Sequence, residues 1–362
     1  MKLSLCMIIK NEEKVLARIL AKAKLFADEI IIVDTGSTDT SKTIAYQYTD
    51  KVYDFEWCDD FALARNFSFS KASFPYIMWL DADDDISSEN IAKIIELKKQ
   101  SLIYDMYMFR YQIAFDEDNN PTFEYYRERI VKNDSKFRWK GFVHEAITLQ
   151  GKINYCDIAI EHRKLEKSRD TGRNLAIYEK HIAKGETLDA RSLFYYSREL
   201  YFNNKIDQAI MSFKKYLDQN KGYLPNIVDA HLTLSKCYIL KGQFDYAKNI
   251  LIDSMKYTQP NAEISCALGE LYLNENNIPA SIFWYTTATI SPINMENGGF
   301  VQKDYYDFVP FLQLSCAYYK LGSKEKFREY HEKAKAIKPT HPSIINNEKY
   351  LKITNLRNNN LQ

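Results

Sequence analysis

The chain contains no run of about 18 apolar residues, so no segment is expected to span a membrane. Its 49 basic and 48 acidic residues leave a net charge of +1, which gives no support for broad nucleic-acid binding. The six cysteines are scattered, without the paired spacing of a zinc site or the density of a disulfide framework. They are therefore predicted to be free thiols of a cytoplasmic protein. The short apolar stretch before Lys10 lacks a small-residue cleavage site, which argues against a signal peptide.

A glycine-rich turn is also missing after the first predicted strand. Apolar runs at Leu3 to Ile9 and Glu29 to Val33, separated by a helical pattern, predict a βαβ unit. A dinucleotide site would need bare backbone after the first strand, but Lys10 to Glu13 stand there and carry two acidic side chains. This pattern favours nucleoside recognition near the second strand, with a diphosphate held by a metal at a later strand.

Two carboxylates lie at the end of a later buried strand. Asp81 and Asp83 follow the apolar run Tyr76 to Leu80, where they form a hard oxygen site for a divalent ion shared with phosphate oxygens. The alternative is an acidic turn in which Asp84 or Ser87 caps the next helix.

Further polar residues are expected near the same crevice. Asp34 ends the second strand, and ligands of open α/β sheets gather at the carboxyl ends of strands. Asp34 is otherwise an ordinary turn residue. Asp60, Arg65 and Asn66 remain outside the apolar face of the helix that follows Trp57. Arg65 either forms a surface ion pair or meets a base or phosphate oxygen.

The second half has the pattern of a helical repeat. Leu234 and Tyr238 recur as Leu268 and Tyr272, a shift of 34 residues (268 minus 234), and the match continues from Leu314 after an insertion. About three to four tetratricopeptide repeats are predicted. They either offer a concave surface to a peptide or protein, or serve as a stabilising or dimerising module. The expected division is residues 1–165, an α/β domain; 166–190, a linker and first helix; 191–354, the all-α repeats; and 355–362, a polar tail.

The N-terminal motifs resemble those of a known family. The segments Met7 to Glu13, Val33 to Asp39, Asp60 to Asn66 and Leu80 to Asp84 look like the successive signatures of family 2 glycosyltransferases, in the same order. That family has the Rossmann-like nucleotide-sugar fold called GT-A and uses inverting chemistry. The resemblance covers roughly residues 1 to 165.

Later motifs are similar to one subgroup of this family. Trp139 to Glu145 and Ile160 to His162 resemble members that carry tetratricopeptide repeats, including the sublancin-type peptide S-glycosyltransferases. Arg163 and Lys164 stand where that subgroup often has Gly-Tyr, so the loop that closes on the diphosphate departs from its pattern.

The resemblance implies roles for individual residues. Glu145 is the expected base that takes the acceptor proton, with His144 beside it as the second catalytic candidate. Asp83 and His162, with Asp81, are the expected ligands of Mn²⁺ or Mg²⁺. The residues assigned to the nucleotide sugar are Asn11, Glu12, Asp34, Asp60, Arg65, Asp81 and Trp139. Surface or core positions are the alternative for each histidine, and Trp139 either stacks on a sugar or plugs the sheet.

The sequence thus predicts a metal-dependent hexosyltransferase that uses a UDP-sugar, with a peptide or protein acceptor recruited by the repeats. An envelope glycan is the alternative acceptor, and a homodimer is the alternative use of the repeats. A nucleotidyltransferase and a scaffold with an inactive transferase domain are the rival functions. A chain ending near Gly185 is expected to keep donor hydrolysis, unless the helical half completes the site with residues such as Arg169 or Arg173.

Overall fold

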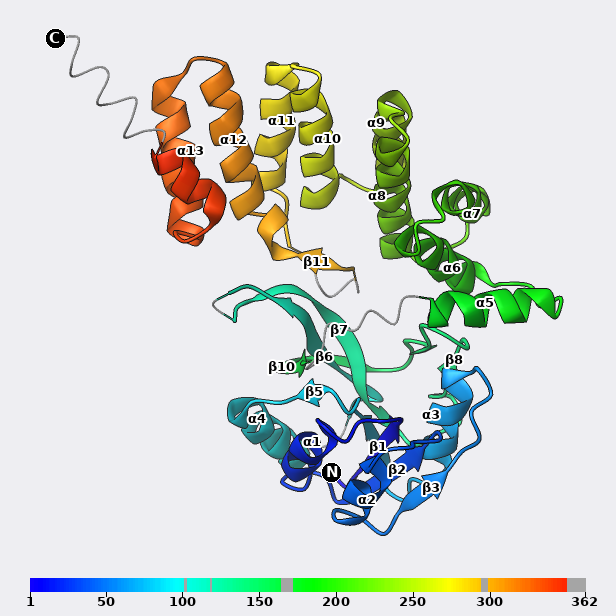
Figure 1. The fold of residues 1–362 in the computed structure, drawn as a ribbon. Coiled ribbons are helices and arrows are strands. Elements are labelled where there is room, and N and C mark those ends of the chain that lie inside the picture. The colour runs from blue at the N-terminus through cyan, green and yellow to red at the C-terminus, as the bar shows by residue number, and fades with distance from the viewer. Residues whose placement is uncertain (101–102, 118, 164–171, 294–298, 350–362) are drawn as a thin grey trace. The chain divides into compact units, whose positions relative to one another are not determined.

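The computed structural model describes residues 1–100, 103–117, 119–163, 172–293 and 299–349. The chain forms two compact units (Figure 1). The first contains Met1–Lys221 and Met295–Phe300, and the second contains Gly222–Asn294 and Val301–Gln362.

A mixed β-sheet forms the centre of the first unit. Its strands run in the order β3-β2-β1-β4-β7-β6-β10-β5. β1 pairs in parallel with β2 and β4, whereas β7 is antiparallel to β4 and β6. Because β1, β2 and β4 are parallel, their carboxyl ends open at one edge of the sheet. The bounds are β1 (Leu3–Ile9), β2 (Glu29–Asp34), β3 (Val52–Asp54), β4 (Tyr76–Trp79), β5 (Asp84–Asp85), β6 (Met106–Phe115), β7 (Pro121–Lys132) and β10 (Ile153–His162).

Helices cover both faces of this sheet. One face packs on α1 (Leu16–Ala23), α2 (Ser41–Tyr46) and α4 (Ser88–Lys99). The other face packs on α3 (Phe61–Ser70) and on the small hairpin of β8 (Trp139–Lys140) and β9 (Ala146–Ile147). Alternate side chains of β1 therefore enter opposite cores, as the pleat of a strand requires. This is the α/β architecture that the sequence predicts.

Three helices after the sheet belong to the same compact unit. They are α5 (Arg173–Ala183), α6 (Ala190–Phe202) and α7 (Ile206–Asp218). On α5, Ile177 and Tyr178 pack with Val143, which lies in the loop between β8 and β9. The compact unit thus extends to Lys221. The expected boundaries near residues 165, 190 and 354 stay predictions, and residues 164–171 and the tail 355–362 lie outside the described residues.

The second unit is a stack of helix hairpins. Within it α10 packs on α11 and α12 on α13, as α8 does on α9. Leu234, Leu268 and Leu314 occupy equivalent positions in the first helices of these hairpins, and all three are fully buried. A Cβ at Gly269 would lie 3.0 Å from the ring of Tyr285, so a small residue is required where these helices approach. This packing confirms the predicted all-α repeat fold. The bounds are α8 (Leu224–Leu240), α9 (Phe244–Asp253), η1 (Ser254–Lys256), α10 (Ala262–Asn274), α11 (Ile278–Thr289), β11 (Val301–Gln302), η2 (Lys303–Tyr305), α12 (Phe308–Lys320) and α13 (Lys324–Ile337).

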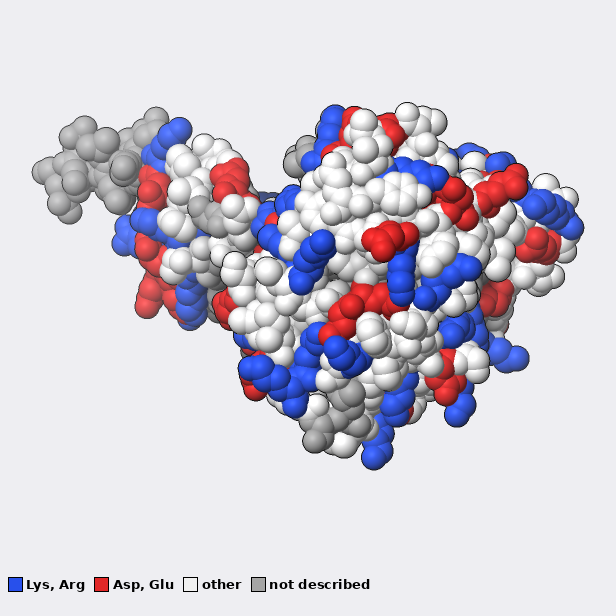
Figure 2. Space-filling model, turned by 90° about the horizontal axis from the view of Figure 1, so that it is seen from below, with Lys and Arg blue, Asp and Glu red and all other residues white. Residues whose placement is uncertain are grey.

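The surface and the helices bear on two expectations about partners. On the face shown in Figure 2, Lys and Arg side chains lie interspersed with Asp and Glu. Among the described residues, no helix is long and apolar enough to cross a membrane.

A buried ion pair braces the turn after β4. Arg129 on β7 donates from one NH1 group to Asp84 Oδ2 at 2.9 Å, and both side chains are fully buried. The same Asp84 oxygen accepts the backbone N–H of Asp81 at 2.9 Å. Asp84 is therefore a buried brace, and the helix cap is Ser87, which accepts the N–H of Asn90.

Replacing Arg129 with methionine should destabilise the protein by about 3–5 kcal/mol, because the buried Asp84 carboxylate would lose its counter-charge. Urea unfolding followed by tryptophan fluorescence measures this loss. Lys42→Met is the matched control, since the partner of Lys42 is the exposed Asp54, and this change should leave the midpoint almost unaltered. Equal shifts in the two variants would contradict the bracing role.

Candidate active site

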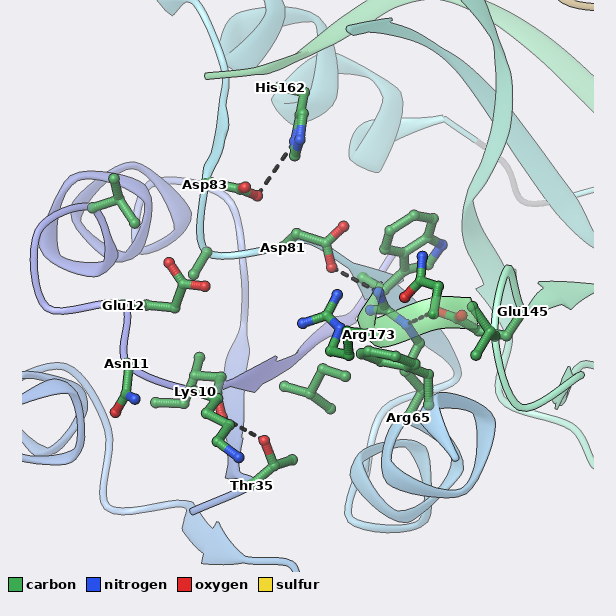
Figure 3. A pocket seen from close by; sticks show the side chains of 18 of the residues that line it. Lys10, Asn11, Glu12, Thr35, Arg65, Asp81, Asp83, Glu145, His162 and Arg173 are labelled. Atoms are coloured by element: carbon green, nitrogen blue, oxygen red, sulfur yellow. Dashed lines mark hydrogen bonds and ion pairs between the residues drawn. The ribbon is translucent and has the colours of Figure 1, made fainter. Parts of the chain in front are cut away.

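A cavity of about 810 Å³ lies at the carboxyl edge of β1, β2 and β4 (Figure 3). Its walls come from the segments that follow these strands, from the end of β10, from the β8–β9 loop and from the start of α5. The predicted site residues that line it are Asn11, Glu12, Arg65, Asp81, Asp83, His144, Glu145 and His162. Parallel strand ends thus bring together motifs that are far apart in the sequence.

Arg65 links two of these carboxylates. Its Nε donates to Glu145 Oε1 at 2.6 Å, and its NH2 donates to Asp81 Oδ1 at 2.7 Å. The guanidinium packs against the rings of both Trp79 and Trp139, which also contact each other edge-on, and only 8% of Arg65 is exposed. Arg65 therefore joins the two carboxylates within the cavity wall, and one charge-assisted hydrogen bond to each of them fixes its guanidinium.

The charge of Arg65 also controls Asp81. Burial alone would raise the pKa of this carboxyl. The positive charges of Arg65 and then of Arg129 have the larger effect and lower the pKa to about 2. Asp81 is thus an anion at neutral pH. In this form it can pair with Arg65 or bind a cation.

Asp83 and His162 face each other on the opposite wall. His162 Nδ1 lies 3.3 Å from Asp83 Oδ1 and 2.9 Å from the hydroxyl of Tyr111. Burial lowers the pKa of His162, but its close contact with Asp83 and the negative charges of Asp83 and Asp84, whose Oδ1 lies 3.8 Å away, raise it to about 9. In the absence of a metal, the protonated ring of His162 therefore attracts the neighbouring carboxylates.

These residues fit a divalent cation. Ligand atoms of Asp83, Asp84 and His162 all lie within 4.8 Å of one another. Asp84 Oδ1 is buried and has no hydrogen-bond partner among the described residues, so it has an unused acceptor at this place. Two carboxylates and an imidazole are ligand types that divalent cations accept. Of the predicted ligands, Asp83 and His162 belong to this group. Asp81 does not, and its ligation stays a prediction.

The loop after β1 is tied to the loop after β2. Asn11, at a φ of 55°, accepts the backbone N–H of Thr38 through its Oδ1 at 2.8 Å. The N–H of Glu12 in turn donates to Ser41 Oγ at 2.6 Å. These bonds hold Asn11 and Glu12 at the cavity while fixing their backbone.

Three predicted nucleotide-binding residues do not line the cavity. Asp34 is 4% exposed and accepts the N–H of Ser37 at 3.2 Å, so it closes a turn. Asp60 caps α3 by accepting the N–H of Leu63 at 2.8 Å. Trp139 is 3% exposed and packs edge-on against Trp79 at 5.0 Å. Each side chain thus has a structural task, and its contact with a nucleotide stays a prediction.

His144 is held by a helix that no motif indicated. Its Nε2 lies 2.7 Å from Glu199 Oε1, and its ring stacks on Tyr195 with centroids 4.3 Å apart. Arg191 donates to the His144 carbonyl oxygen at 3.0 and 3.2 Å, which steadies a backbone φ of 52°. All three residues lie on α6. The helical segment beyond Gly185 therefore contributes to this wall, and the expected behaviour of a chain that ends near Gly185 stays a prediction.

Comparison with known proteins identifies a family for the N-terminal part of the chain. Residues 4–150 match the model of the family described as "Glycosyl transferase family 2". These residues form a family 2 glycosyltransferase domain. The recognised signatures and the cavity both lie in this transferase domain or directly against it.

Parts of the chain are also similar to a TPR repeat-containing protein and to glycosyltransferases. A TPR repeat-containing protein of Synechococcus elongatus is 41% identical over 88 residues, which are 24% of this chain and 22% of that protein. The SPbeta prophage-derived glycosyltransferase SunS of Bacillus subtilis is 26% identical over 238 residues, 60% of this chain and 53% of SunS. The chain thus matches about a fifth of the first protein and about half of SunS. An uncharacterised glycosyltransferase of Rickettsia felis is 35% identical over 88 residues, 24% of this chain and 31% of that protein.

Among solved structures, the TPR protein YrrB covers 50% of this chain and 84% of its own length, at 18% identity and a TM-score of 0.38. A similarity of this extent says nothing about function.

The transferase domain also contains cavity residues that sequence reasoning missed. Arg127 on β7 and Tyr111 on β6 line the cavity, although their strands read as core from the pattern alone. Asp39 lies within a recognised motif but carried no assigned role. Arg173, one of the two arginines considered for the diphosphate, enters from the start of α5 (Figure 3), and Arg169 lies outside the described residues. Only the fold brings these side chains to one place.

The His162 cluster predicts a pH-dependent stability in metal-free buffer. Because its pKa is raised from 6.5 to about 9 in the folded state, the stabilisation is complete below pH 6.5 and is lost as pH rises towards 9. The free energy of unfolding, measured by urea titration in the presence of a chelator, should fall across this window by up to about 1.4 kcal/mol per pH unit. His162→Gln should lack this slope, and Mn²⁺ should reduce it in the unmutated protein, since the metal replaces the proton. Identical slopes with and without His162 would exclude the assignment.

Proposed function

We propose that the protein is an inverting, metal-dependent glycosyltransferase that moves a hexose from a UDP-sugar to a peptide or protein acceptor. The observation that carries the proposal is that one cavity of the transferase domain contains both the Asp83–His162 cluster and the Arg65-linked pair of Asp81 and Glu145. The first is suited to a metal that binds a diphosphate, and the second provides a fixed carboxylate beside it.

The chemistry follows from this division of the cavity. Asp83 and His162, with Asp81 as the further predicted ligand, would hold Mn²⁺ or Mg²⁺. The ion supplies positive charge to the leaving diphosphate. The acceptor's lone pair forms a bond to the anomeric carbon from the face opposite the diphosphate, while the bond from that carbon to the diphosphate oxygen breaks. Glu145 takes the acceptor proton. Arg65 holds Oε1 of Glu145, so that its carboxylate keeps one orientation.

The acceptor and the setting are proposed on other grounds. Similarity to SunS and the stack of helix hairpins support a polypeptide acceptor that is recruited by the repeats. We assign residues 1–165 to the transferase domain and residues 191–354 to the repeats, as the sequence predicts. All six cysteines are free thiols, which supports the reducing cytoplasm as the location.

A donor screen tests the proposal. Among UDP- and GDP-sugars, at least one UDP-hexose should be hydrolysed slowly without acceptor when Mn²⁺ is present, and a chelator should stop this reaction. Asp83→Ala should abolish it and weaken UDP binding in titration calorimetry, because the diphosphate charge would lose its metal. UDP affinity that is the same with and without metal would contradict the metal role. Hydrolysis of no donor at all would favour a scaffold with an inactive transferase domain.

Glu145→Gln separates chemistry from binding. Glutamine keeps the shape and the hydrogen bond to Arg65 but accepts no proton at its amide, so UDP affinity should persist while donor turnover falls roughly 10²-fold or more. Calorimetry and product release measured on one sample compare the two quantities. Turnover that survives in Glu145→Gln would remove Glu145 as the base and point to His144.

A further inference from the structure

Glu199 is a buried carboxylate that the proposed chemistry does not use. Only 13% of its side chain is exposed, and its Oε1 accepts from His144 Nε2 at 2.7 Å and from Asn174 Nδ2 at 3.2 Å. Burial raises the pKa of Glu199, but the hydrogen bond from His144, the positive charge that His144 carries when protonated and the hydrogen bond from Asn174 outweigh this effect and lower it. Glu199 is therefore an anion that accepts hydrogen bonds and donates none.

An acceptor at Nε2 determines the tautomer of a neutral imidazole. Because Glu199 only accepts, the proton of neutral His144 must sit on Nε2, and the lone pair is then on Nδ1. Tyr195 covers one face of the ring, and Arg191 holds the carbonyl oxygen of the same residue. Nδ1 is left as the one polar ring atom without a hydrogen-bond partner among the described residues, and His144 lines the cavity next to Glu145.

We propose that Glu199 is a positioning residue of the transfer reaction, which fixes His144 so that Nδ1 accepts a hydrogen bond from the acceptor substrate. This inference rests on the proposed glycosyl transfer. The hydrogen-bond donor on the acceptor is an N–H or O–H group of a polypeptide next to the attacking atom. His144 orients the acceptor through this bond, and the proton that is lost on attack goes to Glu145. The helix α6 thereby contributes to recognition of the acceptor rather than of the nucleotide.

The alternative is a purely structural role, in which Glu199 and His144 join α6 to the β8–β9 loop. The two roles differ in what they require of the imidazole. A structural contact needs only a proton on Nε2, so it works with the neutral Nε2–H ring or with the imidazolium, whereas acceptance at Nδ1 requires the neutral ring. They also differ in effect, since loss of a structural contact would affect donor hydrolysis and transfer together.

The tautomer of His144 is measured by long-range ¹H–¹⁵N spectra of the full-length protein at mildly alkaline pH. The protein has six histidines, and loss of one set of signals in His144→Gln assigns the residue. The proposal expects a protonated Nε2 and an unprotonated Nδ1 in the unmutated protein. In Glu199→Gln, whose amide donates as well as accepts, the fixed tautomer should give way to a mixture. A proton on Nδ1 in the unmutated protein, whether in the other tautomer or in the imidazolium, would overturn the proposal without any variant.

Kinetics measure the consequence. The probes are three peptides that differ only in a central Cys, Ser or Thr, together with the UDP-hexose that the unmutated enzyme hydrolyses. Glu199→Gln should lower kcat/KM for the peptide relative to donor hydrolysis by roughly tenfold, with most of the loss in KM, as expected for one charged hydrogen-bond pair. Glu179→Gln on α5 is the matched control, because Glu179 forms a surface ion pair with Lys205 and does not line the cavity, and it should leave both reactions unchanged.

A double-mutant cycle completes the design. If Glu199 acts through His144, Glu199→Gln should have no further effect on peptide transfer in the His144→Gln background. Additive losses, or an equal loss of hydrolysis and transfer in Glu199→Gln, would support the structural role and overturn the proposal. Failure of the glycosyltransferase proposal itself is distinct: the unmutated enzyme would then consume no nucleotide sugar, while the His144 tautomer would still be measurable.

Discussion

The buried guanidinium of Arg65 is the interaction on which the cavity depends. It forms ion pairs with two carboxylates that come from different parts of the chain, Asp81 after β4 and Glu145 after β8. Without a cation between them, two anions in a partly buried wall would repel each other and attract protons. A planar guanidinium that also packs against two indole rings donates to both carboxylates at once, and lysine could not do so with the same geometry.

A second buried arginine plays a comparable part for the metal-type cluster. Arg129 compensates Asp84, and Asp84 in turn receives the N–H of Asp81. The acidic turn is thus held in place without a cation, and its partly buried carboxylate, Asp83, contacts His162. Of the two readings of this turn, a metal site and a capped acidic turn, the structure combines elements of both. Asp84 is structural, while Asp83 and His162 fit a cation.

The helices after the sheet have a larger part than their repeat-like pattern suggests. α5 contributes Arg173 and Asn174 to the cavity wall, and α6 holds His144 by its ring and by its carbonyl oxygen. A transferase domain that ended with the sheet would leave His144, at its strained backbone angle, without these contacts. The first compact unit therefore brings the wall with Asp83 and His162 and the wall with His144 and Glu145 together in one folded body.

The sequence by itself determined the architecture and the places where chemistry gathers. Apolar periodicity predicted the α/β unit and the helical repeats, and both are confirmed, because these signals are local and repeat at 2.0 or 3.6 residues. Ordered motifs predicted a family 2 glycosyltransferase domain, and the family match confirms it. Eight of the predicted site residues line one cavity. Five of them, Asn11, Glu12, Asp81, Asp83 and His162, end or follow strands whose carboxyl ends share an edge, whereas Arg65 lies on α3, and His144 and Glu145 lie between β8 and β9.

Only the tertiary structure decided which side chains meet. Arg65 lies 80 residues from Glu145, and His144 lies 55 residues from Glu199, and no periodicity relates such positions. The tasks of Asp34, Asp60 and Trp139 as turn, cap and core residues were equally hidden, because a carboxylate or an indole at the end of an element serves a ligand or the backbone with the same atoms. Packing, which excludes water from some of these groups and leaves others at the cavity, is what distinguishes them.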